Sequence, residues 1–362
     1  MEGHDNGGTQ KLQIVALTSV APLKVTESRR IRQVVGSDDH TIQPRTINGC
    51  YKIVLFYEKL NEEDRGWSMA SWLVESLARA LLEYPLLAGR LQRRGGDMGL
   101  EIVCNDSGIR LLEARYPMTL LEFLDLNKKE HLEAELVFWK EIDDQFPEFS
   151  PLVYVQVTNF ECGGYSIGIS CSLLLAEVLI VENFLKKWAE IHNKLPQNEE
   201  IKTPIFYHPG LKKNPEPLPS DIISRTESKN GVQSTVFKVT AKDANFSKEL
   251  ALLCVEDAER KLSIKMGSDF SLFVKESSEI IKVESCSKNG YTMQGSGLKN
   301  QITRATWNDF GVYEVAFHEG NKPLLVSCWF GSVADVHVMA IPCPKENAFT
   351  VIVVSPPVET EL

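Results

Sequence analysis

The sequence predicts a two-domain α/β protein, and three observations carry this prediction. The chain has 362 residues, more than one domain of ordinary size contains. Hydrophobic residues make up 43% and charged residues 24%, a composition typical of a globular protein with a sizeable core. Prolines crowd one polar segment, which separates two stretches of helix and strand patterns. We therefore expect an N-terminal domain over residues 1–195, a crossover linker over 196–230 and a reduced C-terminal domain over 231–362.

The first half shows both strand and helix periodicities. Residues 49–57 are rich in β-branched and aromatic side chains, as strands are. Trp72, Leu77 and Leu81 recur at helical spacing, and Pro85 ends that pattern because proline disfavours helix at the residue before it. After a disordered lead over 1–9, we expect strands at 11–20, 49–57, 100–104, 109–114, 152–160 and 165–172, and helices at 68–84, 119–126 and 176–193.

The second half is expected to be richer in strands. After the linker, the patterns predict one strand followed by one helix, and then a series of short apolar runs of strand character. The expected strands are 235–240, 301–307, 313–317, 324–329, 336–341 and 349–354, with a helix at 243–261.

Charge and cysteine content exclude several classes of function. The net charge is −10 and no basic patch stands out, so we expect no nucleic-acid partner. None of the eight cysteines forms a C-x-x-C pair, which indicates reduced thiols in an intracellular protein and no metal site. The polar N-terminus resembles no signal peptide, and the apolar run 173–181 is too short for a transmembrane segment. We expect a cytoplasmic protein, and peripheral association with the endoplasmic reticulum stays open.

Common catalytic signatures are absent from the chain. It contains no P-loop, no G-x-G-x-x-G, no G-x-S-x-G and no H-E-x-x-H. None of the seven histidines is followed four residues later by aspartate. His131 is followed by Glu135, but the segment 128–135 is highly charged and is expected to form an exposed helix.

Three motifs nevertheless resemble one family. Residues 77–91 (LARALLEYPLLAGRL), 104–110 (CNDSGIR) and 149–164 (FSPLVYVQVTNFECGG) are similar to plant BAHD acyltransferases, and especially to the eceriferum-type branch. The resemblance covers residues 11–200 well and returns more weakly over 235–330. It implies a CoA-dependent acyltransferase fold, similar to that of chloramphenicol acetyltransferase, with a shortened C-terminal domain. The site would lie between the domains.

The resemblance also implies a chemistry and a departure from it. Family members transfer an acyl group from acyl-CoA to a hydroxyl or amine, with no tightly bound cofactor, and the histidine of an H-x-x-x-D motif is the general base. The matching positions here are Leu173 and Glu177. Leucine accepts no proton, and general-base assistance is typically worth about 10²–10⁴ in rate. We expect acyl-CoA to be a ligand or co-substrate, and we assign no catalytic residue.

Two further departures concern the second half. The family's D-F-G-W-G segment is present only as Asp309, Phe310 and Gly311, and that motif is structural in the family. In the family, an arginine after the crossover meets the catalytic aspartate. Only Arg260 and Arg304 lie beyond residue 230, which predicts an incomplete wall on the CoA side.

Other residues could replace the missing base. Cys171, Ser172 and Glu177 are close in sequence, and a buried glutamate can act as a base because burial raises its pKa. For Cys171 and Ser172 we favour a structural role in packing. Side chains alternate along a strand, so we expect one of the two to point into a core and the other to face the cleft. His318, just after the degenerate motif, is expected to be a turn histidine.

Three hypotheses follow. The first is a catalytically silent accessory protein in acyl-CoA and very-long-chain fatty acid metabolism, working with a fatty-acid elongase condensing enzyme. The second is an active acyl-CoA-dependent O- or N-acyltransferase with a base other than histidine. The third is a protein-interaction scaffold that binds no acyl-CoA. Architecture alone does not choose among them.

Overall fold

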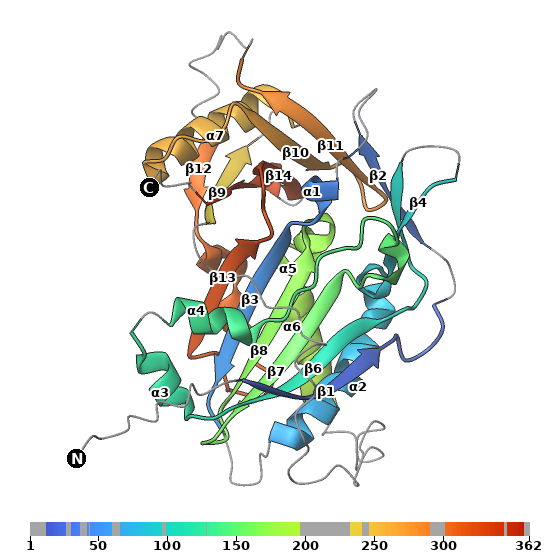
Figure 1. Ribbon diagram of the computed structural model, residues 1–362, viewed down its shortest axis with the longest axis vertical. Helices are drawn as coiled ribbons and strands as arrows, with labels where there is room; N and C mark the ends of the chain where they lie inside the picture. Colours follow the sequence, from blue (N-terminus) through green and yellow to red (C-terminus); the bar gives the residue numbers. More distant parts are fainter. Residues whose placement is uncertain are drawn as a thin grey trace, which may run out of the picture.

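Two β-sheets, one above the other along the long axis, form the body of the molecule in the computed structural model (Figure 1). The predicted lead over 1–9 and the predicted linker over 196–230 lie outside the described residues. The structure describes residues 12–26, 30–36, 42, 44–59, 66–95, 99–127, 129–195, 232–240, 246–289, 301–343 and 346–357.

The first sheet has the strand order β1-β6-β7-β8-β3-β13. Only the pair β6 and β7 is parallel; the other neighbours run antiparallel. Its strands are β1 (Gln13–Val20), β6 (Ile109–Tyr116), β7 (Val153–Phe160), β8 (Tyr165–Ser172), β3 (Cys50–Tyr57) and β13 (Leu325–Gly331).

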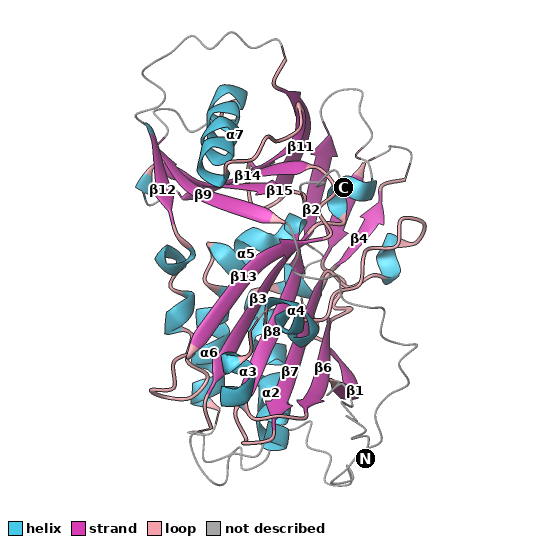
Figure 2. Cartoon of the chain, turned by 60° about the vertical axis from the view of Figure 1, so that its left-hand side comes forward, coloured by secondary structure: helices cyan, strands magenta, loops and turns pink. Residues whose placement is uncertain are grey.

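Helices cover both faces of this sheet. Helices α2 (Gly66–Glu83) and α6 (Phe184–Lys194) pack on one face, where Leu77 and Trp188 join the largest hydrophobic cluster. The short helices α3 (Leu120–Asp125) and α4 (Glu130–Glu133) lie over the opposite face (Figures 1 and 2). Because both faces are covered, β3, β7 and β8 are buried at almost every position.

The second sheet draws its strands from both halves of the chain. Its order is β12-β9-β15-β14-β10-β11-β2-β5-β4, so three strands from the first half close one edge, while β13 from the second half joins the first sheet. Helix α7 (Lys248–Leu262) packs on one face of this sheet. The strands are β12 (Ile302–Ala305), β9 (Gln233–Thr240), β15 (Ala348–Ser355), β14 (Val336–Cys343), β10 (Asp269–Lys275), β11 (Ile280–Ser287), β2 (Ile31–Gly36), β5 (Leu100–Val103) and β4 (Arg90–Arg93).

The two sheets share one hydrophobic core. Phe273, Met339 and Ile352 of the second sheet belong to the same buried cluster as Ile53 and Ile169 of the first. The short helix α1 (Pro44–Ile47) leads into β3 at this junction. Packed side chains and ion pairs join the two sheets here, so residues from distant parts of the sequence are held together.

The α/β prediction is confirmed, and the differences in detail have local causes. The single helix predicted over 176–193 is divided into α5 (Ala176–Ile180) and α6, because Asn183 takes a left-handed conformation with φ of 58°. The strand predicted over 313–317 is wrong: Val312–Glu314 form a 3₁₀ turn. The sequence reading also missed β2, β4, β10 and β11.

Candidate functional site at the junction of the two sheets

Leu173 occupies the position that the resemblance gives to the general base. It begins a 3₁₀ turn, Leu173–Leu175, directly after β8, and only 4% of it is exposed. Its backbone N–H donates to the Gly49 carbonyl at 3.1 Å. A Cβ on Gly49 would lie 2.6 Å from Leu173 Cδ1, so the missing side chain of Gly49 makes room for the leucine. The position is therefore packed with hydrocarbon and carries no titratable group.

Glu177, four residues further on, is buried in an ion pair. Its carboxylate accepts a hydrogen bond from the Arg32 guanidinium, and the two side chains are 4% and 1% exposed. Arg32 also donates to the Leu174 carbonyl at 3.3 Å and to the Ser278 carbonyl at 2.9 Å. Arg32 thus ties β2 to the turn after β8 and to the loop between β10 and β11.

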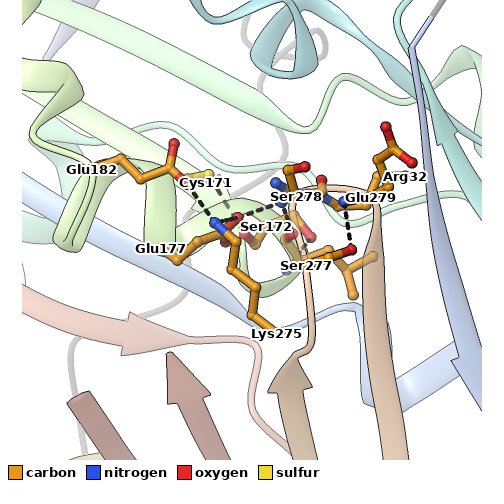
Figure 3. A network of polar contacts seen from close by, with 10 residues as sticks. Arg32, Cys171, Ser172, Glu177, Glu182, Lys275, Ser277, Ser278 and Glu279 are labelled. Carbon is orange, nitrogen blue, oxygen red and sulfur yellow. Dashed lines mark hydrogen bonds and ion pairs between the residues drawn. The ribbon is translucent and has the colours of Figure 1, made fainter. Parts of the chain in front are cut away.

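Lys275 extends this network, as Figure 3 shows. Its ammonium at the end of β10 lies 3.5 Å from the Glu177 carboxylate and forms a second ion pair with Glu182. Two cations and two carboxylates balance each other in charge. The arrangement is that of a structural clamp between the sheets, in which two cations hold the Glu177 carboxylate.

Cys171 and Ser172 point to opposite faces of β8, as strand alternation requires, and both are fully buried. Cys171 packs into the core against the helices, where burial raises the pKa of its thiol well above the usual value. The thiol stays protonated and is a poor nucleophile. The Ser172 hydroxyl accepts a hydrogen bond from the Leu174 N–H at 3.3 Å and caps the turn.

The degenerate segment in the second half forms a tight turn. The Asp309 carboxylate accepts a hydrogen bond from the Thr306 N–H at 2.7 Å. Phe310 packs against Trp307, with ring centroids 5.8 Å apart. Gly311 has φ of 65°, and a Cβ there would lie 2.3 Å from Lys186 Nζ. The conformation favours glycine, whereas the flexible end of Lys186 could move aside for a larger residue.

The remaining predicted residues lie away from Leu173. His318 forms a bridge with Asn321 in the turn before β13, and its ring lies 5.9 Å from that of His192. That turn is at the opposite end of the first sheet, about 20 Å away at about 3.3 Å per residue along β3. Arg260 and Arg304 both pair with Asp257.

Sequence reasoning missed the residues that contact Glu177. Arg32 and Lys275 are separated from it by 145 and 98 positions, and no local pattern marks either as its partner. It also missed His337 of β14, which is fully buried against Phe273 with ring centroids 5.3 Å apart. Burial lowers the pKa of the His337 imidazole and keeps it neutral.

The described residues contain neither a metal-binding cluster nor a helix that could span a membrane. Among them, no group of three or more His, Cys, Asp or Glu side chains is arranged to hold a metal ion. None of the helices in that part of the chain combines the length and the apolar character that crossing a bilayer requires.

Comparison with known proteins places the chain. The protein-family model described as Transferase family matches residues 37–270 of the chain. The chain belongs to this family. The resemblance to BAHD acyltransferases is thereby confirmed, and relatives named for eceriferum proteins are among the matches.

Curated relatives share parts of the sequence. Identity is 37% over 145 residues with Brassinosteroid-related acyltransferase 1 of Arabidopsis thaliana, 39% of this chain and 31% of that protein. Identity with Hydroxycinnamoyltransferase of Narcissus pseudonarcissus is 27% over 255 residues, 66% of this chain and 56% of that protein. Protein ECERIFERUM 2 of Arabidopsis thaliana is 30% identical over 123 residues, 32% and 29% of the two chains. The matches span between about a third and just over half of these relatives' lengths.

Solved structures were also compared. Vinorine synthase aligns over 96% of this chain and 95% of its own, with 16% identity and a TM-score of 0.49. TRI101 of F. graminearum complexed with ethyl coenzyme A aligns over 91% and 95%, with 11% identity and a TM-score of 0.41.

Proposed function

We propose that this protein is a non-catalytic member of its family that binds an acyl-CoA at the junction of the two sheets. In this proposal it acts as an accessory factor in acyl-CoA metabolism, in the extension of very-long-chain acyl groups by a condensing enzyme. The partial similarity to eceriferum proteins supports this context.

The observation that carries the proposal is the set of groups around Leu173. The base position holds a buried leucine, and the nearest candidates for a replacement are all engaged or inert. Glu177 is paired with Arg32, the Cys171 thiol is held protonated, and the Ser172 hydroxyl caps a turn. Among the described residues, an alcohol acceptor would therefore find no group beside Leu173 to take its proton, although an acyl chain could still be held.

The test is turnover with and without a restored histidine. Purified wild-type protein and the Leu173→His variant are incubated with acyl-CoAs and a panel of alcohols and amines, and free CoA is measured. We expect no release above the uncatalysed rate from wild type. Because the general base is the missing part, we expect Leu173→His to release CoA in the presence of an acceptor about 10²-fold or more faster than the wild-type protein does.

A matched control guards against a general effect of histidine. Leu175→His places the same group two residues away in the same buried turn and should release no CoA. Acceptor-dependent CoA release by the wild-type protein, abolished by a substitution at the junction, would contradict the proposal and favour an active acyltransferase.

A further inference from the structure

Lys52, near the start of β3, is a buried cation for which the described residues supply no counter-ion. Its side chain is 1% exposed. Among the described residues, it forms no hydrogen bond and no ion pair, whereas the other charged groups at the junction are paired. A buried charge is costly unless it is paired. The chain thus keeps a positive charge that its own described residues leave uncompensated.

The position of the ammonium is defined by Gly331. A Cβ on Gly331 would lie 2.9 Å from Lys52 Nζ, so the ammonium rests where a side chain on β13 would otherwise stand. Gly331 pairs with Cys50, which pairs with Ser172 on the other side. The ammonium is therefore level with the last residue of β8, and it lies about two strand spacings, roughly 10 Å, from the turn that begins at Leu173.

The surroundings of Lys52 combine apolar walls with hydrogen-bond donors. Directly opposite residues lie on the same face of a sheet, which places Trp329, Ser170 and Tyr154 in one row with Lys52. The Ser170 hydroxyl is used, because it donates to the Phe138 carbonyl. Trp139 stacks edge-on against Tyr154, 5.7 Å between ring centroids, and its indole N–H is buried without a partner in the described part of the chain.

Both unpaired groups, the Lys52 ammonium and the Trp139 N–H, can donate hydrogen bonds but cannot accept them. The Lys52 ammonium calls for a ligand that supplies acceptor oxygens and negative charge. A single ammonium balances one charge, which fits a carboxylate and not a phosphate dianion. Aromatic side chains beside it fit the hydrocarbon part of an organic acid.

We propose that Lys52 binds the carboxylate of an organic acid whose apolar part lies along this face of the first sheet. The inference rests on the proposed function for the idea that an acyl group occupies the junction, and adds a charged group to that ligand. The carboxylate belongs either to a free fatty acid or to the far end of a dicarboxylic acyl-CoA.

Two pairs of probes distinguish the sources. Calorimetric titrations at pH 7.5 compare decanoate with 1-decanol, and glutaryl-CoA with pentanoyl-CoA, which lacks the terminal carboxylate. We expect the wild-type protein to bind one carboxylate probe about 10- to 100-fold more tightly than its uncharged counterpart, as a charge-assisted hydrogen bond implies.

Two variants and a control locate the effect. Lys52→Met keeps the length of the side chain and should abolish the preference, with the uncharged probe bound as before. Gly331→Ala should weaken the preference by displacing the ammonium, because only the flexible end of Lys52 has to move. Lys261→Met removes an exposed cation at the end of α7 and should change nothing.

The outcomes separate this inference from the proposed function. Binding of pentanoyl-CoA with no carboxylate preference would overturn the role of Lys52 and leave acyl-CoA binding intact. A preference that survives in Lys52→Met would overturn it as well, as would a folded wild-type protein that binds none of the four probes. Thermal unfolding of Lys52→Met without ligand at or above the wild-type temperature is also expected.

Discussion

Removing Arg32 should unfasten the two sheets from each other. In Arg32→Met, the Glu177 carboxylate is left 4% exposed with only Lys275 at 3.5 Å, and the carbonyls of Leu174 and Ser278 lose a donor. Breaking one side of a buried ion pair typically costs about 3–5 kcal/mol. Against a total stability of about 5–15 kcal/mol, the variant should fold but unfold at much lower urea.

The matched double variant tests the cause of this loss. In Arg32→Met/Glu177→Leu no charge is left unpaired, because Lys275 still has Glu182. Replacing both members of a buried pair by apolar residues is often close to neutral, so most of the lost stability should return. Arg304→Met is the control: its side chain is 54% exposed beside Asp257, and its loss should cost at most about 1 kcal/mol.

Urea unfolding followed by tryptophan fluorescence measures these differences. A loss below about 1 kcal/mol in Arg32→Met would refute the clamp. So would a double variant whose loss equals the sum of the two single losses, because the two residues would then be energetically independent.

Two further predictions concern stability. Burial raises the pKa of Glu113 to about 7 in the folded protein, whereas the unfolded chain releases this proton near pH 4.5. The contribution of Glu113 to the free energy of unfolding is therefore fully present below about pH 4.5 and is lost as the pH rises through 7. Glu113→Gln should thus be stabilising by up to about 3 kcal/mol at pH 8 and neutral at pH 4, and equal effects at both pH values in urea titrations would contradict this. Gly49→Ala should cost about 1–3 kcal/mol, since its Cβ would lie 2.6 Å from Leu173 Cδ1; Gly49→Ala/Leu173→Val should recover part of that loss in the same assay, and no recovery would show that the contact is unimportant.

Strong local patterns carried most of the prediction of the fold. The helix around Leu77 and the hairpin of β7 and β8 were predicted to within a few residues, because apolar periodicity and turn residues act locally. Strand β10 was missed although Phe270 and Leu272 alternate with polar residues, a signal that was available. The break at Asn183 depends on a single left-handed residue, which periodicity does not reveal.

The site was less predictable than the fold. The resemblance located Leu173 and Glu177, but the arginines that it drew attention to, Arg260 and Arg304, pair with Asp257 and not with Glu177. The partner is Arg32, because β2 crosses into the second sheet and lies beside β11. Lys52 drew no attention in the sequence, since a lysine inside an apolar strand reveals its lack of a partner only once the neighbouring strands are placed.

The most direct test of the account is equilibrium binding of acyl-CoAs of increasing chain length to the purified, folded protein by calorimetry. The account predicts saturable binding that tightens with each methylene, by up to about fourfold, as expected for a buried hydrocarbon chain. Absence of saturable binding at every chain length would contradict it and would make a protein-interaction scaffold the better description.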